Sequence, residues 1–425
     1  MNKFLTLLSA LCISVAATAV EPSESVRQLG SNYYAYPYPA NPLPELTAAP
    51  EGYTPFHIEH YGRHGSRWHI GTKSYTRPIE LLEPAEKAGA LTPRGQELLA
   101  QLREIEVKSR GRDGELTDVG AAQHRGIARR MFSNFPQVFA DSARVDARST
   151  VVIRCILSMD NELQELLALN PSLRITSDAS QADMRYMNFS DPYSIGNNAA
   201  KKGEKEYKKF AATRNYHGDY LQKLVSDPAV RDSINSASLF YYLFNIAANA
   251  QSHTDQVAPY DIFSERELRE KWEADNASWH QRMGNEARTD GLAPYSQRRL
   301  LANLIESADT AIASRKPGAN LRFGHEVIVL PLVVLMELDD YGKEYNDFNT
   351  LADHWRNYEI FPMACNVQMI FYGNDNDPSA PVLVKVLLNE REVRLPVAPA
   401  AQGAPYYDWN DLKSYYQKKL ARVDF

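Results

Sequence analysis

The chain has few cysteines, no excess of positive charge and little apolar sequence in long runs, and each shortage excludes a class of protein. Of the 425 residues three are cysteine, and only Cys155 and Cys365 lie beyond the first twenty positions. Two thiols permit one disulfide without demanding it, and they exclude a small disulfide-held scaffold. A net charge of −6 argues against a general nucleic-acid binder. The apolar run LPLVVLMEL meets Glu337 and two aspartates at once, so it is too short to span a membrane.

The first twenty residues, MNKFLTLLSALCISVAATAV, have the pattern of a secretory signal. Lys3 supplies the positive start, an apolar stretch follows, and the small residues at 17–19 fit a cleavage site. A bulky Leu11 before Cys12 argues against a lipoprotein signal. We therefore predict a signal peptide over 1–19 and a soluble mature chain that is exported, periplasmic or secreted. About 400 residues remain, which is enough for two or three domain-sized cores.

The first part of the mature chain has the pattern of an α/β core. Residues 20–50, rich in Pro, Tyr and Ala, predict an extended lead-in with little regular structure. A strand is predicted over 53–61, so that it ends beside a cluster of histidines. Apolar residues at three- and four-residue spacing predict three helices, over 94–109, 117–132 and 148–171.

The middle of the chain differs from what surrounds it. Short polar helices dominate from about 180 to 315 and no convincing strand occurs there, so we interpret 176–315 as a helical cap domain. It would be inserted between two parts of the core, 20–175 and 316–425. The core resumes with LRFGHEVIVLPLVVLMEL, which predicts a short strand, a loop at Gly324 and an apolar helix. Near the end, VQMIFYG and PVLVKVLLNEREVRLPV predict two strands joined by the turn-forming NDNDPSA.

The stretch HIEHYGRHGSRWH, residues 57–69, contains four histidines, and it fits either a metal cage or a reactive histidine. Imidazole and carboxylate suit zinc or iron, and the candidate ligands would be His57, Glu59, His60 and His64. Side chains alternate along a strand, however, so the first and third of these would point to opposite faces. Arg63 and Arg67 also raise the cost of adding a cation. The sequence therefore favours a site without metal.

The pattern Arg-His-Gly-x-Arg fits an anion site better. Guanidinium groups are always charged and match phosphate oxygens two at a time, which suits Arg63 and Arg67 to that role. Glycine beside His64 lets the backbone approach a ligand closely. A neutral imidazole in line with a phosphorus atom can act as a nucleophile, while the arginines stabilise the transferring phosphoryl group. Such chemistry still needs a proton donor and further positive groups.

Two distant segments could supply them. Arg154 lies within the helix predicted over 148–171, where an unpaired charge is costly. It could bind phosphate, pair with a core carboxylate or extend to solvent. His325 and Glu326 follow a predicted strand and open a predicted helix, a usual place for site residues in α/β folds. Glu326 could protonate a leaving oxygen, or it could simply complement the helix dipole.

Four motifs occur in an order that resembles a known family: RHGSR at 63–67, LTDVGAAQH at 116–124, RSTVVIRCILSM at 148–159 and FGHE at 323–326. The chain resembles the histidine acid phosphatases, the second branch of the histidine phosphatase superfamily. Within that branch it looks most like the multiple inositol polyphosphate phosphatases, which include phytases. The resemblance spans roughly residues 50–400. It implies a phosphoglycerate-mutase-like three-layer α/β core with an inserted helical cap domain.

The resemblance also implies a role for each motif residue. His64 would be the nucleophile and form a phosphohistidine, without metal or other cofactor. The phosphate would be bound by Arg63, Arg67, Arg154 and His325. Glu326 would donate a proton to the leaving oxygen and then activate water. The family carries His-Asp or His-Ala-Glu where this chain has His325 and Glu326 with nothing between them, so the spacing here fits neither subgroup.

Three functions remain open from the sequence. The first is a phosphomonoesterase for inositol polyphosphates such as phytate, and the second a broad acid phosphatase for small or sugar phosphates. A third, of another class, is a non-catalytic phospho-ligand binder. A basic run, KKGEKEYKKFAATR, could form a lip for a substrate with several phosphates, or it could be a solvated helix face. The lip candidates are Lys201, Lys202, Lys205 and Arg214, with Lys208 and Lys209 beside them.

Overall fold

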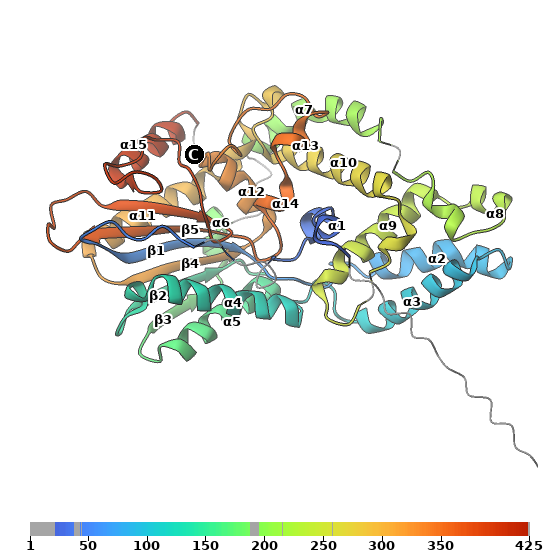
Figure 1. Ribbon diagram of the computed structural model, residues 1–425, viewed down its shortest axis with the longest axis horizontal. Coiled ribbons are helices and arrows are strands. Elements are labelled where there is room, and N and C mark those ends of the chain that lie inside the picture. Colours follow the sequence, from blue (N-terminus) through green and yellow to red (C-terminus); the bar gives the residue numbers. More distant parts are fainter. Residues whose placement is uncertain are drawn as a thin grey trace, which may run out of the picture.

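A computed structural model describes residues 22–37, 43, 45–187, 195–214, 216–256 and 258–423. The predicted signal peptide, 1–19, lies outside this part of the chain. Figure 1 shows a sheet covered by helices on both faces, with a second body of helices beside it. No helix in the described ranges is long and apolar enough to cross a membrane.

The sheet has eight strands, and its centre is parallel while one side is antiparallel. Seven of them follow the order β3-β2-β4-β1-β5-β6-β7, and β8 pairs with β6. Strand β1 lies in the middle, parallel to β4 and antiparallel to β5. Strands β2 and β3 continue the parallel side. The strands are β1 (Tyr53–Arg63), β2 (Arg144–Ser149), β3 (Arg174–Asp178), β4 (Gly318–Gly324), β5 (Asn366–Asn374), β6 (Leu383–Leu388), β7 (Arg391–Glu392) and β8 (Tyr407–Asp408).

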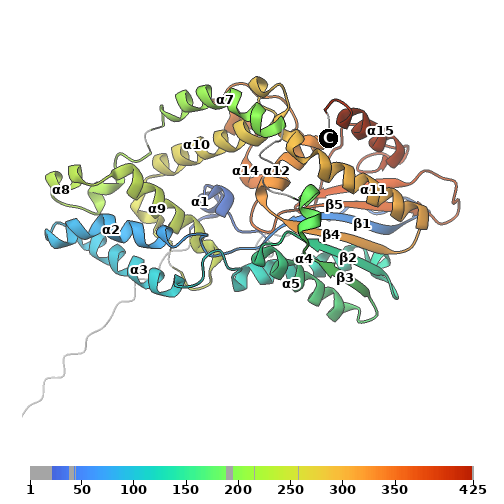
Figure 2. The same ribbon diagram turned by 180° about the vertical axis from the view of Figure 1, so that it is seen from behind.

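Two apolar clusters make the sheet the middle of three layers. Ile58 packs with residues of α4 (Asp118–Asn134) and α5 (Ile153–Leu169). Tyr61 packs on the opposite side, in the cluster of α11 (Arg298–Ser314), α12 (Glu326–Leu335) and α15 (Trp409–Leu420). The alternation of side chains along β1 sends these two residues to opposite faces. Figures 1 and 2 show the two groups of helices above and below the sheet, which confirms the predicted three-layer α/β class.

The helical body beside the sheet draws on two stretches of sequence. One apolar cluster joins residues of α2 (Lys73–Lys87), α3 (Pro93–Ser109), α8 (Pro228–Ser233), α9 (Ser236–Asn249) and α10 (Glu265–Met283). Helix α7 (Ile195–Ala211) packs on α10. Helix α11, at the end of the predicted insertion, packs instead on β1 and α12. The predicted domain boundaries at 176 and 315 stay a prediction.

Two predicted elements differ from the structure. The helix predicted over 148–171 is a strand end followed by a helix, because β2 runs to Ser149 and α5 begins at Ile153. Buried Val145 and Ala147 alternate with more exposed residues, which is the period-two pattern of a half-buried strand. The second C-terminal strand also turns back on itself. Asn389 and Glu390 have φ values of 51° and 63°, so β6 and β7 form a hairpin.

Candidate active site

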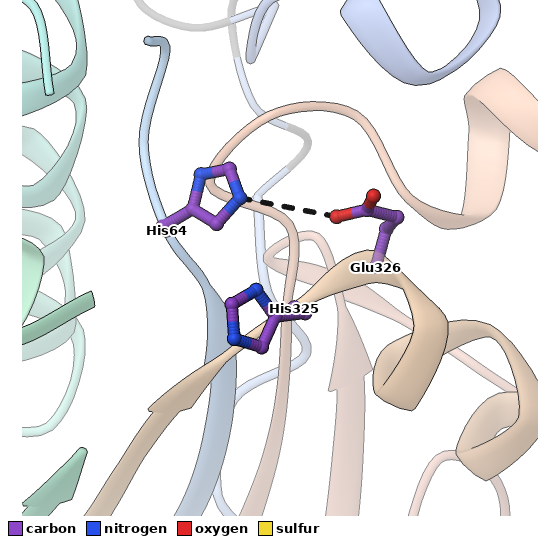
Figure 3. Close-up of side chains that lie close together, drawn as sticks. All are labelled: His64, His325 and Glu326. Atoms are coloured by element: carbon purple, nitrogen blue, oxygen red, sulfur yellow. Dashed lines mark ion pairs between the residues drawn. The ribbon is translucent and has the colours of Figure 1, made fainter. Parts of the chain in front are cut away.

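The two halves of the site meet because their strands are neighbours. His64 follows β1, and His325 is the N-cap of α12, directly after β4. The strands are parallel and Arg63 pairs with Gly324, so both chains leave the sheet at the same edge. The imidazole rings of His64 and His325 lie 5.6 Å apart at 75°. Figure 3 shows the His64 ring turned toward the Glu326 carboxylate, 3.9 Å from Nε2 to oxygen.

The His64 imidazole is held in the form that a nucleophile needs. Its Nδ1 lies 2.9 Å from the Gly65 carbonyl oxygen, which can only accept, so Nδ1 carries the proton. Nε2 is therefore left with its lone pair on the side of Glu326. Burial and the positive charge of Arg154 lower the pKa of His64 well below its usual range, and Arg63 adds to this effect. The ring is neutral and can attack an electrophile.

Arg63 is fully buried, and its guanidinium is fixed from three directions. Nη1 donates to the Phe361 carbonyl at 2.8 Å, and Nη2 donates to the Asn32 carbonyl at 2.9 Å. Nε lies 3.1 Å from the Glu326 carboxylate. Because three groups hold one rigid plane, the charge of Arg63 has a set position next to the nucleophile.

Arg67 and Arg154 each have a buried Nε–H group that could donate a hydrogen bond to a bound anion. Arg67 donates through Nη1 to the Trp68 carbonyl at 3.0 Å. Within the described ranges, Nε of Arg67 and Nε of Arg154 are buried without a hydrogen-bond partner. A buried unpaired donor is costly, and cationic donors more so. An anion that reaches both residues would remove this cost. Arg154 lies in the first turn of α5, where it faces the site, and not inside the helix as the sequence predicted.

His325 and Glu326 occupy different protonation states. Burial lowers the pKa of His325 to about 4, although Glu326 opposes this shift. Its Nε2 lies 3.2 Å from the Thr150 hydroxyl. Burial acts to raise the pKa of Glu326, yet Arg63 and Arg67 outweigh it and hold that pKa at about 2. In the unliganded protein Glu326 is therefore a carboxylate and His325 a neutral ring.

The loop that carries His64 is fixed by α4 and α5, a support that the sequence interpretation did not foresee. Gln123 accepts from the Ser66 backbone N–H at 2.9 Å and donates to the Ser66 hydroxyl at 3.0 Å. Thr117 donates to the Ser66 carbonyl at 3.1 Å. From α5, the Ser158 hydroxyl accepts from the Gly65 N–H at 3.1 Å. The motif LTDVGAAQH supplies two of these residues, so it was the signal that could have revealed them.

Gly120 lets α4 pack directly on this loop, and Gly120→Ala should destabilise the fold. A Cβ at that position would lie 2.7 Å from the Ser66 backbone nitrogen, and backbone cannot move aside cheaply. We expect a loss of about 1–3 kcal/mol in the free energy of unfolding, the usual cost of overpacking, measured by urea denaturation. Gly126→Ala in the same helix is the control. Its Cβ would meet only the flexible end of Arg130, so a gain of about 0.5–1 kcal/mol is expected. Equal losses in both variants would refute the close-packing explanation.

The metal cage considered for residues 57–69 does not assemble. His57 lies 2.9 Å from Glu59, and Glu59 pairs with Arg322 at 2.6 Å. His60 packs against Phe323 at 5.4 Å between ring centres, and its buried position lowers its pKa to about 3. Glu59 is already paired with Arg322, so these side chains pack and form ion pairs inside the fold and do not form a metal site.

A different trio, His64, His325 and Glu326, has ligand atoms within 4.8 Å of one another, close enough to hold a metal ion. The positive charges of three arginines act on the same atoms and lower the pKa of His64. A divalent cation would have to overcome that repulsion, whereas an anion is attracted by it. The donor set therefore fits phosphate better than metal.

The lip candidates lie on or just after α7, and two of them are in ion pairs. Lys202 pairs with Asp290 at 2.6 Å, and Arg214 pairs with Glu273 at 3.0 Å. Lys201 and Lys205 are exposed. Their contact with a substrate stays a prediction. The two cysteines, for which the sequence allowed a disulfide, are both free and buried.

Comparison with solved structures shows which proteins share this fold. No family model and no curated protein matches the chain. Among solved structures, the Bifidobacterium longum multiple inositol polyphosphate phosphatase in complex with inositol hexasulfate matches with TM-score 0.74 and 18% identity, over 92% of this chain and 97% of that one. The phytase from D. castellii matches with TM-score 0.65 and 15% identity, over 93% and 85%. The Hafnia alvei phytase matches with TM-score 0.55 and 12% identity, over 88% and 98%. The chain therefore has the fold of these phosphatases, as its four motifs predicted.

Proposed function

We propose that this protein is a metal-independent phosphomonoesterase that removes phosphates from inositol polyphosphates such as phytate. One observation carries the proposal: a neutral histidine faces a carboxylate beside Arg67 and Arg154, whose buried Nε–H groups have no hydrogen-bond partner among the described residues. The fold shared with an inositol polyphosphate phosphatase and with phytases supports this choice of substrate. Export to the periplasm or the exterior is part of the proposal and rests on the sequence of residues 1–19.

The geometry supports a two-step reaction. In the first step, Nε2 of His64 attacks phosphorus, the P–O bond to the alcohol breaks, and the leaving oxygen takes a proton from Glu326. The arginines stabilise the charge on the transferring phosphoryl group. In the second step, Glu326 removes a proton from water, whose oxygen attacks phosphorus as the P–N bond breaks. Inorganic phosphate leaves and His64 is neutral again.

Phosphate release with a chelator present tests the proposal. We expect release from inositol hexakisphosphate to be faster than from a simple aryl phosphate, and to be unchanged by the chelator. Comparable rates on both substrates would move the assignment to a broad acid phosphatase. Inhibition by the chelator would restore the metal site at His64, His325 and Glu326. Binding of phosphate without turnover of either ester would leave the non-catalytic binder.

A further inference from the structure

The N-terminal segment, residues 22–37, lies between the sheet and the helical body. Figure 1 shows its helix α1 (Glu24–Gln28) in that position. On the helical side, Gln251 donates to the Arg27 carbonyl at 3.2 Å and accepts from the Ala35 N–H at 3.0 Å. On the other side, Asn357 donates to the Ser31 hydroxyl at 2.6 Å. The segment predicted as an extended lead-in is thus fixed to both bodies.

This segment also reaches two of the phosphate-clamp arginines. The Asn32 carbonyl accepts from Arg63 at 2.9 Å. The guanidinium carbon of Arg67 lies 5.6 Å from the centre of the Tyr33 ring, within range of a cation–π interaction. The Tyr33 ring meets the His69 ring edge-on at 5.0 Å, so it is itself held in place. Two consecutive residues therefore contact two different arginines of the site.

We propose that Tyr33 is a positioning residue for Arg67, which makes the N-terminal segment part of the phosphate clamp. Arg67 has a long flexible side chain, and its hydrogen bond to the Trp68 carbonyl uses one corner of the guanidinium. The Tyr33 ring gives the group a second contact, because the guanidinium carbon lies over the ring. A guanidinium fixed before phosphate arrives loses less conformational freedom on binding. The proposal rests on the proposed function for its meaning in catalysis.

The chemistry of a phenol suits this role. Burial raises the pKa of Tyr33, although Arg67 opposes the shift, so the hydroxyl stays neutral. A carboxylate in the same place would neutralise Arg67 and compete with phosphate for it. Tyrosine orients the cation and leaves its charge available to the ligand.

The test compares Tyr33→Leu with Tyr33→Phe and with Tyr34→Phe, using inorganic phosphate and inositol hexakisphosphate. Tyr34 is the adjacent residue, and its hydroxyl bonds Glu24 instead of the site. We expect Tyr33→Leu to weaken phosphate binding about three- to tenfold, read by calorimetry, and to lower kcat/KM about as much, since the cation–π contact with Arg67 is lost. Tyr33→Phe should bind phosphate nearly as the wild type does, because the ring remains over Arg67. Tyr34→Phe should bind phosphate like the wild type.

A double-mutant cycle separates positioning from folding. In an Arg67→Gln background, Tyr33→Leu should have no further effect on phosphate affinity. An equal effect in both backgrounds, or wild-type phosphate affinity in Tyr33→Leu, would overturn the proposal. The failure of the proposed function would show differently, as a wild type that binds phosphate but hydrolyses no ester. The affinity readout then still tests Tyr33.

Discussion

His64→Ala should lower kcat by about five to six orders of magnitude, the size of loss seen when a covalent nucleophile is removed. Nε2 of His64 lies 3.9 Å from the Glu326 carboxylate, and no second nucleophile is placed in this way among the described residues. Without the imidazole no P–N bond can form, while the arginines remain to hold phosphate. We therefore expect phosphate binding to survive the loss of turnover. Steady-state rates and an acid-quench search for phosphohistidine measure the two effects.

The control is a histidine outside the candidate site. His354 is exposed at the end of α13 (Leu351–His354) and stacks on Tyr345. His354→Ala should keep wild-type rates. Near-full activity in His64→Ala, or phosphohistidine in its acid-quenched protein, would show that the covalent mechanism is wrong.

Glu326→Gln should slow alkyl phosphates about 10²- to 10⁴-fold, the usual contribution of a general acid, and slow aryl phosphates far less. A poor leaving group needs a proton as the P–O bond breaks, whereas an aryl oxide leaves as an anion. Glutamine keeps the size of the side chain but has no proton to give. The measurement is kcat for a series of esters with leaving groups of rising pKa. A uniform loss across the series would show that Glu326 acts on binding and not on proton transfer.

The low pKa of Glu326 decides where that proton comes from. With a pKa of about 2, the free carboxyl is ionised across the working range. A phosphate monoester holds its second proton up to about pH 6. We infer that the ester brings the proton in and Glu326 receives it, because the arginines favour the dianion. The kcat/KM of alkyl esters should then fall as pH rises past the second pKa of the substrate. Glu344→Gln, at an exposed position, should leave that profile unchanged.

The sequence predicted the chemistry of the site better than its scaffold. RHGSR and FGHE could be interpreted because arginine, histidine and glutamate have few uses in such spacing, and because a Gly-His turn after a strand predicts where the chain leaves the sheet. Arg154 was predicted as a ligand but placed inside a helix. Its apolar neighbours hid the end of β2 at Ser149, since a short apolar run fits a strand or a helix equally well.

The contribution of Asn32 and Tyr33 could not be predicted. Their contacts with Arg63 and Arg67 join segments about thirty positions apart through a fold built from the whole chain. A stretch rich in Pro and Tyr has no hydrophobic periodicity from which its tertiary contacts could be predicted. The lip candidates show the opposite case. Their charge pattern was evident, but a pattern of lysines does not distinguish a ligand surface from the ion pair of Lys202 with Asp290.

The position of the N-terminal segment affects how the nascent chain folds. The Tyr34 carbonyl accepts a hydrogen bond from the Met363 N–H at 2.7 Å, and the Tyr36 hydroxyl donates to the Glu390 carboxylate at 2.8 Å. Tyr34 and Tyr36 therefore find these two partners only when most of the chain has left the ribosome. Strand β1 must also wait for β4 and β5 before it has a neighbour on either side. Such distant pairing slows folding, and it means that the candidate site cannot assemble in a growing chain before β4 and β5 have been synthesised.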